Sequence, residues 1–230
     1  MSRLASFKGP STPTSSPVQA RQPVTPISPS RLSESTYHRK LRSLLQELRA
    51  VTETWDDIVL VDGLKAAKTL VDARTELDND LAVLPAGTRP AYRIVQPKLE
   101  LMEGRIADLD AVIVKLKKQF AKMNNLVDSI EAILFEAHKV KGWEWVQDPL
   151  WVTWSLEKFV SSVPEILIPY HRSLEMHIEL VDTLRSHDVT FEASRYAIAQ
   201  WVVQPHLEEG SWDAQWEDLC AAEIDRWNSR

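Results

Sequence analysis

The fold is decided by residues 95–137, VQPKLELMEGRIADLDAVIVKLKKQFAKMNNLVDSIEAILFEA. Apolar residues recur along this stretch at alternating steps of four and three without a break, which is the pattern of a coiled-coil seam. At about 1.5 Å per residue, a helix over these positions is roughly 64 Å long, more than a compact globule of this size needs. We therefore expect a long helix packed lengthwise on another helix. The seam consists of Val95, Leu99, Met102, Ile106, Leu109, Ile113, Leu116, Phe120, Met123, Val127, Ile130, Leu134 and Ala137.

A second apolar stripe precedes the seam and is its expected partner. It slips in phase near Gly63 and stops at Pro85, Gly87 and Pro90, so a short connection predicts an antiparallel helical hairpin. The spacing leaves open whether the seam is covered within the chain or by another chain. The stripe comprises Leu41, Leu44, Leu48, Val51, Trp55 and Ile58, then Ala66, Leu70, Ala73, Leu77, Leu81 and Leu84.

Composition narrows the class of protein. The chain has 230 residues, and its 6 Gly are few for that length, which disfavours Gly-rich phosphate loops and all-β folds. A single Cys excludes a disulfide framework; with no apolar leader and no long apolar run, an intracellular, reducing compartment is expected. The net charge of -6 gives no general electrostatic reason to bind nucleic acid. We predict an all-α fold.

Residues 1–36 differ from the rest of the chain and are predicted to form a disordered tail. They hold six Pro and thirteen Ser or Thr but no Trp or Tyr, so they cannot bury enough surface to offset the entropy of ordering. A local charge of +3 leaves -9 on the remainder. Four hydroxyl-proline pairs make candidate phosphosites, although such pairs also arise by chance in a tail of this composition. They begin at Thr12, Ser16, Thr25 and Ser28.

The tail is followed by two expected parts, a hairpin over 37–141 and a C-terminal helical part over 142–230. Residues 142–154 hold four of the nine Trp and are predicted to be a non-helical linker, because Gly142 and Pro149 oppose helix. Three helices are expected after it, over residues 155–186, 191–203 and 211–228. The second of them should be capped by Thr190 and ended by Pro205. Pro164 and Pro169 should kink the first of them near its start.

Signatures of catalysis are absent from the sequence. No HExxH, paired CxxC, GxxxxGK[ST] or GxSxG occurs, so we predict neither enzymatic activity nor a metal or cofactor. His171 and His177 lie six residues apart, off the shared face that helical metal ligands need, and Cys220 is expected to be a small core residue. Nucleic-acid binding is a weak expectation, and it rests on the lysine cluster Lys115, Lys117, Lys118 and Lys122.

The candidate partner-binding residues are tryptophans and residues that belong to the same short stretches or follow later in the chain. Trp is enriched among interface anchors, although these side chains could equally plug the open end of the helical hairpin. We select six linker residues and four later positions as the partner-binding candidates, with the tryptophans and Tyr170 as anchors fixing the end of the helical rod. The candidates are Trp145, Pro149, Leu150, Trp151, Thr153, Trp154, Tyr170, Trp201, Gln204 and Pro205.

Two short motifs within this set resemble the cyclin-dependent-kinase-interacting protein family (CINP). One is the Pro-Leu-Trp-x-Thr-Trp run that starts at Pro149, and the other is Trp201-x-x-Gln204-Pro205. Phe159, Tyr170, Arg172, Leu174 and Glu208 lie between and after them. The resemblance covers roughly residues 40 to 225 and excludes the Pro/Ser-rich tail.

That resemblance implies a non-enzymatic, mainly nuclear adaptor, with the cytoplasm as a second compartment. It would bind cell-cycle kinases, including cyclin-dependent kinases, in DNA replication and the DNA damage checkpoint. With a related helical subunit, it would also belong to an AAA-ATPase assembly in maturation of the large ribosomal subunit. The alternative is a structural coiled-coil subunit of a kinetochore, cytoskeletal or tethering complex, which needs the seam but neither motif.

Overall fold

The computed structural model describes residues 34–85, 87–208 and 212–221. The chain divides into residues 1–33 and 34–230. Residues 1–33 of the expected tail, which include its four candidate phosphosites, therefore lie outside the described residues. Glu34 and Ser35 belong to the second unit, so the folded part begins before the boundary that composition placed at residue 36. Their side chains bond to helical residues, which composition could not reveal.

Every regular element of the described residues is helical, which confirms the all-α prediction. The one β-type pairing among them is an isolated bridge between Pro149 and Ser155. No helix in the described ranges is long and apolar enough to cross a membrane.

The first helical rod runs from residue 36 to residue 82 and changes its winding once. Helix α2 (Thr36–Asp57) continues through a six-residue π-helix, η1 (Ile58–Gly63), into α3 (Leu64–Ala82). A π turn takes up an extra residue, because its hydrogen bonds span five residues instead of four. This winding explains the predicted slip near Gly63, because it keeps both halves of the stripe on the core side.

Helix α4 (Tyr92–Lys141) carries the predicted seam through 50 residues. It packs antiparallel against α2, η1 and α3, as the hairpin prediction requires, and also against the later helix α7 (Leu167–Arg185). Eight of its seam residues are buried and five are half-buried. The chain itself thus covers most of the seam, and the five half-buried positions remain partly accessible.

The C-terminal part departs from prediction at its start. Gly142 ends α4 with a φ of 89°, but α5 (Trp143–Gln147) follows at once, so the expected non-helical linker is wrong over these residues. A left-handed glycine reverses the chain without preventing a new helix. The irregular part of the linker is residues 148–155.

The predicted third helix consists of three segments. Helix α6 (Leu156–Ser162) is capped by Ser155, the 3₁₀ segment η2 (Val163–Ile166) contains Pro164, and α7 follows. The predicted break near the prolines is therefore present.

The remaining helices close the C-terminal part. Helix α8 (Phe191–Val203) begins after the cap Thr190 and ends before Pro205 as expected, and α9 (Pro205–Glu208) and α10 (Trp212–Leu219) follow. Residues 222–228 of the last predicted helix lie outside the described residues.

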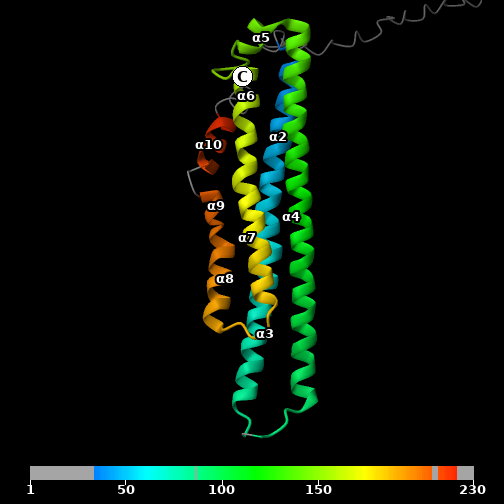
Figure 1. Ribbon diagram of the computed structural model, residues 1–230, viewed down its shortest axis with the longest axis vertical. Coiled ribbons are helices and arrows are strands. Elements are labelled where there is room, and N and C mark those ends of the chain that lie inside the picture. The colour runs from blue at the N-terminus through cyan, green and yellow to red at the C-terminus, as the bar shows by residue number, and fades with distance from the viewer. Residues whose placement is uncertain (1–33, 86, 209–211, 222–230) are drawn as a thin grey trace, which may run out of the picture. The chain divides into compact units, whose positions relative to one another are not determined.

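The helices α7 and α8 cover the hairpin along only part of its length. In Figure 1, α8 lies beside α7, and the connected ends of α3 and α4 extend beyond both. Helix α8 contacts α3 and α7. The result is a bundle that is several helices thick near the start of α2 and two helices thick at the free end of the hairpin.

Candidate functional site

The predicted partner-binding residues fall into two separate clusters. The end cluster is formed by Trp145, Leu150, Trp151 and Trp154, which lie on α5, on the 148–155 turn and before α6. The π-helix cluster is formed by Tyr170, Trp201 and Gln204, which pack near η1. The structure therefore brings each motif together internally but does not join the two motifs into one surface.

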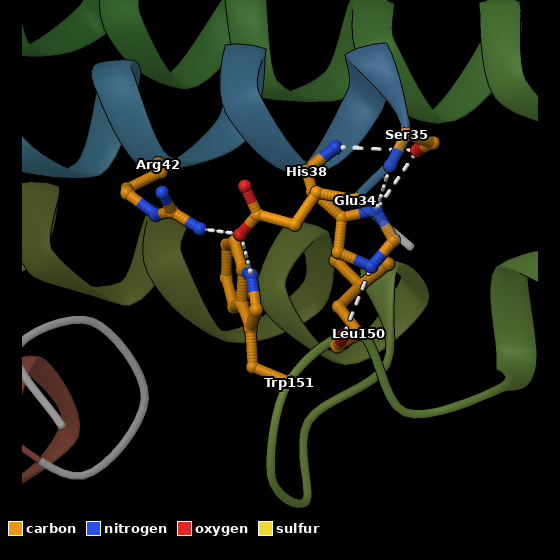
Figure 2. A network of polar contacts seen from close by, with 6 residues as sticks. All are labelled: Glu34, Ser35, His38, Arg42, Leu150 and Trp151. Carbon is orange, nitrogen blue, oxygen red and sulfur yellow. Dashed lines mark hydrogen bonds and ion pairs between the residues drawn. The ribbon is translucent and has the colours of Figure 1, made fainter. Parts of the chain in front are cut away.

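The end cluster is tied to the first turn of α2 through His38. The backbone N–H of Ser35 donates to His38 Nδ1 at 3.3 Å, and His38 Nε2 lies 2.9 Å from the carbonyl oxygen of Leu150 (Figure 2). A nitrogen that accepts a hydrogen bond carries no proton, so Nε2–H is the donor to Leu150 and the ring is neutral. Burial lowers the pKa of His38, and the bond to Leu150 offsets part of that effect. The His38 imidazole thereby connects the start of α2 to the 148–155 turn.

Glu34 makes the second link between these segments. Its Oε1 accepts from the Arg42 guanidinium and, at 3.3 Å, from Trp151 Nε1 (Figure 2). The guanidinium carbon of Arg42 also lies 5.5 Å from the centre of the Trp151 ring. The Glu34 side chain is only 7% exposed, so the carboxylate is enclosed by its two donors. Charge-assisted bonds in such a site are stronger than ion pairs in water.

The indoles of the end cluster fill the end of the bundle. Trp151 and Trp154 pack on the buried Phe159 with ring centres 5.7 Å and 5.1 Å away, while Trp145 lies 5.5 Å from Tyr37. All three indoles are half-buried. This geometry supports the plug interpretation of the tryptophans. The predicted residues here that remain exposed are Pro149 and Thr153.

Trp201 fixes α8 to the π-helix. Its indole is fully buried, and Nε1 donates to the carbonyl oxygen of Val59 at 2.9 Å. That carbonyl also accepts from the backbone N–H of Leu64, five residues on, as π-helical winding requires. The π-helix thus presents a carbonyl that the indole can reach, and the two elements are locked together.

Gln204 ends α8 and reaches the first rod. Its backbone adopts the left-handed conformation, with a φ of 45°, and its Oε1 accepts from Trp55 Nε1 at 3.2 Å. Its Nε2 donates to Asp56 at 3.3 Å. Tyr170 stands edge-on to Trp55 at 5.2 Å. The Trp-x-x-Gln-Pro motif is therefore a helix end: Trp201 and Gln204 anchor it, and Pro205 starts α9.

The two clusters differ in what they leave accessible. Tyr170, Trp201 and Gln204 are buried by the chain itself, at 4%, 0% and 6% exposure. Their side chains cannot meet a partner unless α8 leaves the bundle. In this conformation they hold the fold, and their role as partner-binding residues stays a prediction.

Sequence reasoning missed three residues of these sites. Glu34 and Arg42 carry no motif, because their partner Trp151 is more than one hundred residues away. The signal that could have revealed His38 is its place three residues after Ser35, as in a capping box.

His177 lies on α7 and is fully buried. Nδ1–H donates to the Ser173 carbonyl at 2.6 Å, and the ring stands edge-on to Trp201 at 4.6 Å. Burial lowers the pKa of His177 to about 4, and backbone interactions with Ser173 and Trp201 offset a smaller part. The imidazole is therefore neutral at physiological pH and part of the core.

Other candidate reactive groups are dispersed. Cys220 is buried, as expected for a small core residue. His171 is exposed and lies 4.0 Å from Glu175. Across the described ranges, no group of three or more His, Cys, Asp or Glu side chains is placed to hold a metal ion.

Comparison of the chain with protein-family models and with curated proteins finds no match in either set.

Proposed function

We propose that the protein is a helical adaptor that binds other proteins and transforms no substrate. The proposed type is that of the cyclin-dependent-kinase-interacting family, a mainly nuclear subunit of an AAA-ATPase assembly that also contacts cell-cycle kinases. Support for the type comes from the Pro149–Trp154 and Trp201–Pro205 motifs. Both motifs stabilise the helical bundle from within. We therefore expect partners to bind the outer surface of the bundle instead of the motif side chains.

One observation carries the adaptor role: the free end of the hairpin exposes apolar side chains. Val83 is 84% exposed and Tyr92 74%, and Ile94 is 40% exposed near the start of the long seam helix. Helices α7 and α8 end before this part of the hairpin (Figure 1). Large apolar side chains gathered at one exposed place are typical of docking surfaces. Partner burial there would remove them from water at about 25 cal/mol per Å², less the cost of ordering both proteins.

The test is affinity purification of the tagged full chain from its own cells at moderate salt. We expect a kinase or an ATPase to co-purify with a second helical protein, and Tyr92→Ser with Ile94→Ser to release at least one of them. Val114→Ser is the matched control, because Val114 lies on the same helix and is 67% exposed. A chain that purifies alone, or a double variant that retains every partner, would contradict the proposal.

Proximity labelling distinguishes the proposed type from the coiled-coil alternative. Nucleolar and replication proteins among the labelled neighbours support the proposed family. Microtubule, kinetochore or vesicle proteins would instead identify a structural subunit.

A further inference from the structure

A groove between α4 and α7 belongs to neither cluster and lies away from the free end of the hairpin. It encloses about 310 Å³ and is lined by Phe120, Leu167, Ile168, His171 and Arg172. Phe120 is a seam residue that the chain leaves half-buried, and Ile168 is 56% exposed. The groove therefore has an apolar floor that is accessible from solvent.

Positive charge flanks this floor on both helices. Arg172 lines the groove from α7, and Lys117 lies one turn before Phe120 on α4, on the same side of that helix. In the described part of the chain, neither side chain has an ion pair. The neighbouring lysines differ, because Lys115 pairs with Asp62 at 2.7 Å and Lys122 with Glu47 at 2.9 Å. Two lysines of the cluster are thus paired with the first rod, Lys117 lies at the groove, and Lys118 is exposed.

We propose that this groove binds an acidic amphipathic helix of a partner protein. The apolar floor would receive about two aliphatic side chains one turn apart, as in helix-in-groove recognition, while carboxylates on either side meet Lys117 and Arg172. The chain carries a net charge of -6, and Glu175 lies 4.0 Å from the lining residue His171. Beside the floor, Lys117 and Arg172 are two cations that no carboxylate of the described residues pairs, which favours carboxylates on the partner. The volume is at the small end of the range for ligand pockets, which suits side chains better than a cofactor.

Nucleic acid fits the same groove less well. Phe120 is the aromatic residue of the floor, and its ring lies 5.4 Å from that of His171. A half-buried ring in that position is a poor platform for a base, and single-strand binders need several such platforms along a basic track. The inference rests on the proposed adaptor role and names one class of partner for it.

The test is a binding measurement with a defined probe. A fluorescein-labelled alanine-based helical peptide of about four turns carries two leucines at i and i+4 and glutamates flanking them. We expect saturable binding to the full chain by fluorescence polarisation, weakened by salt. Lys117→Glu with Arg172→Glu should weaken it at least about tenfold. A peptide with lysine in place of glutamate should bind that double variant better than it binds the wild-type chain.

One control variant and one further variant of the groove keep the test falsifiable. Lys118→Glu changes another exposed lysine, which helical geometry turns about 160° away from Phe120, and it should leave peptide binding unchanged. Ile168→Ser should reduce peptide binding at unchanged helix content. Equal binding by the wild-type chain and the double charge variant would overturn the inference. It would also be overturned by an oligonucleotide that binds through Lys117 and Arg172 where the acidic peptide does not. Either outcome leaves the adaptor role intact if partners still co-purify through the hairpin end.

Discussion

Gly63 lies directly against the indole of Trp201: a Cβ added to Gly63 would come within 2.4 Å of the ring carbon Cζ2. The glycine stands in the π-helix, four residues after the carbonyl of Val59 that accepts the indole N–H. Close approach of the ring therefore depends both on the winding of η1 and on the missing side chain at residue 63. This pair of residues joins the first rod to α8.

Gly63→Ala should destabilise the chain although alanine is the better helix former. The propensity gain is at most about 1 kcal/mol. The clash forces the ring or the backbone to move, and such overpacking costs about 1–3 kcal/mol. Urea unfolding followed by circular dichroism should show a net loss of stability. Gly104→Ala is the control, because a Cβ on that helical glycine has open space and should stabilise the chain. A Gly63→Ala chain as stable as the Gly104→Ala chain would contradict this packing.

His177 should make stability fall with acid over a defined range. Its pKa in the folded chain is about 4, against an ordinary value of 6.5, so the unfolded chain binds the proton first. The contribution of the neutral ring is complete above about pH 6.5 and is lost as the pH falls towards 4. A shift of this size corresponds to about 3 kcal/mol at full titration.

The histidine contribution can be separated from that of the carboxylates. We expect NMR titration of the His177 ring signals to show no protonation above about pH 5, and His177→Phe to flatten the fall in unfolding free energy between pH 6.5 and 5. A ring that titrates near 6.5 would show that it is not buried as described.

Local pattern was enough to predict the long elements but not their contacts. The seam predicted α4, and Thr190 with Pro205 bounded α8, because periodicity and capping are written within a few residues. The link from Glu34 to Trp151 could not be predicted in this way. Composition assigned Glu34 to the tail, and only the fold brings it to an indole N–H. Likewise, sequence alone could not show that Lys115 is paired and Lys117 is not.

Glu34→Gln should cost more stability than the removal of an exposed carboxylate. It removes the negative charge from a side chain that is 7% exposed and faces both Arg42 and Trp151. We expect a loss of about 1–3 kcal/mol, as for charge-assisted bonds that are shielded from water. Glu136→Gln removes an exposed pair with Lys40 and should cost less than about 1 kcal/mol. Urea unfolding of both variants measures the comparison, and equal losses would mean that the Glu34 site is open to water.

Gln204 offers the sharpest separation of backbone and side-chain effects. Gln204→Ala and Gln204→Gly both remove the acceptor from the buried Trp55 indole, which should cost about 1–3 kcal/mol. Only glycine also relieves the left-handed backbone, with its φ of 45°, by about 1 kcal/mol. The glycine variant should therefore be the more stable of the two by about that amount in urea unfolding. If alanine were as stable as glycine at this position, the end of α8 could not have the left-handed turn that places Pro205 at the start of α9.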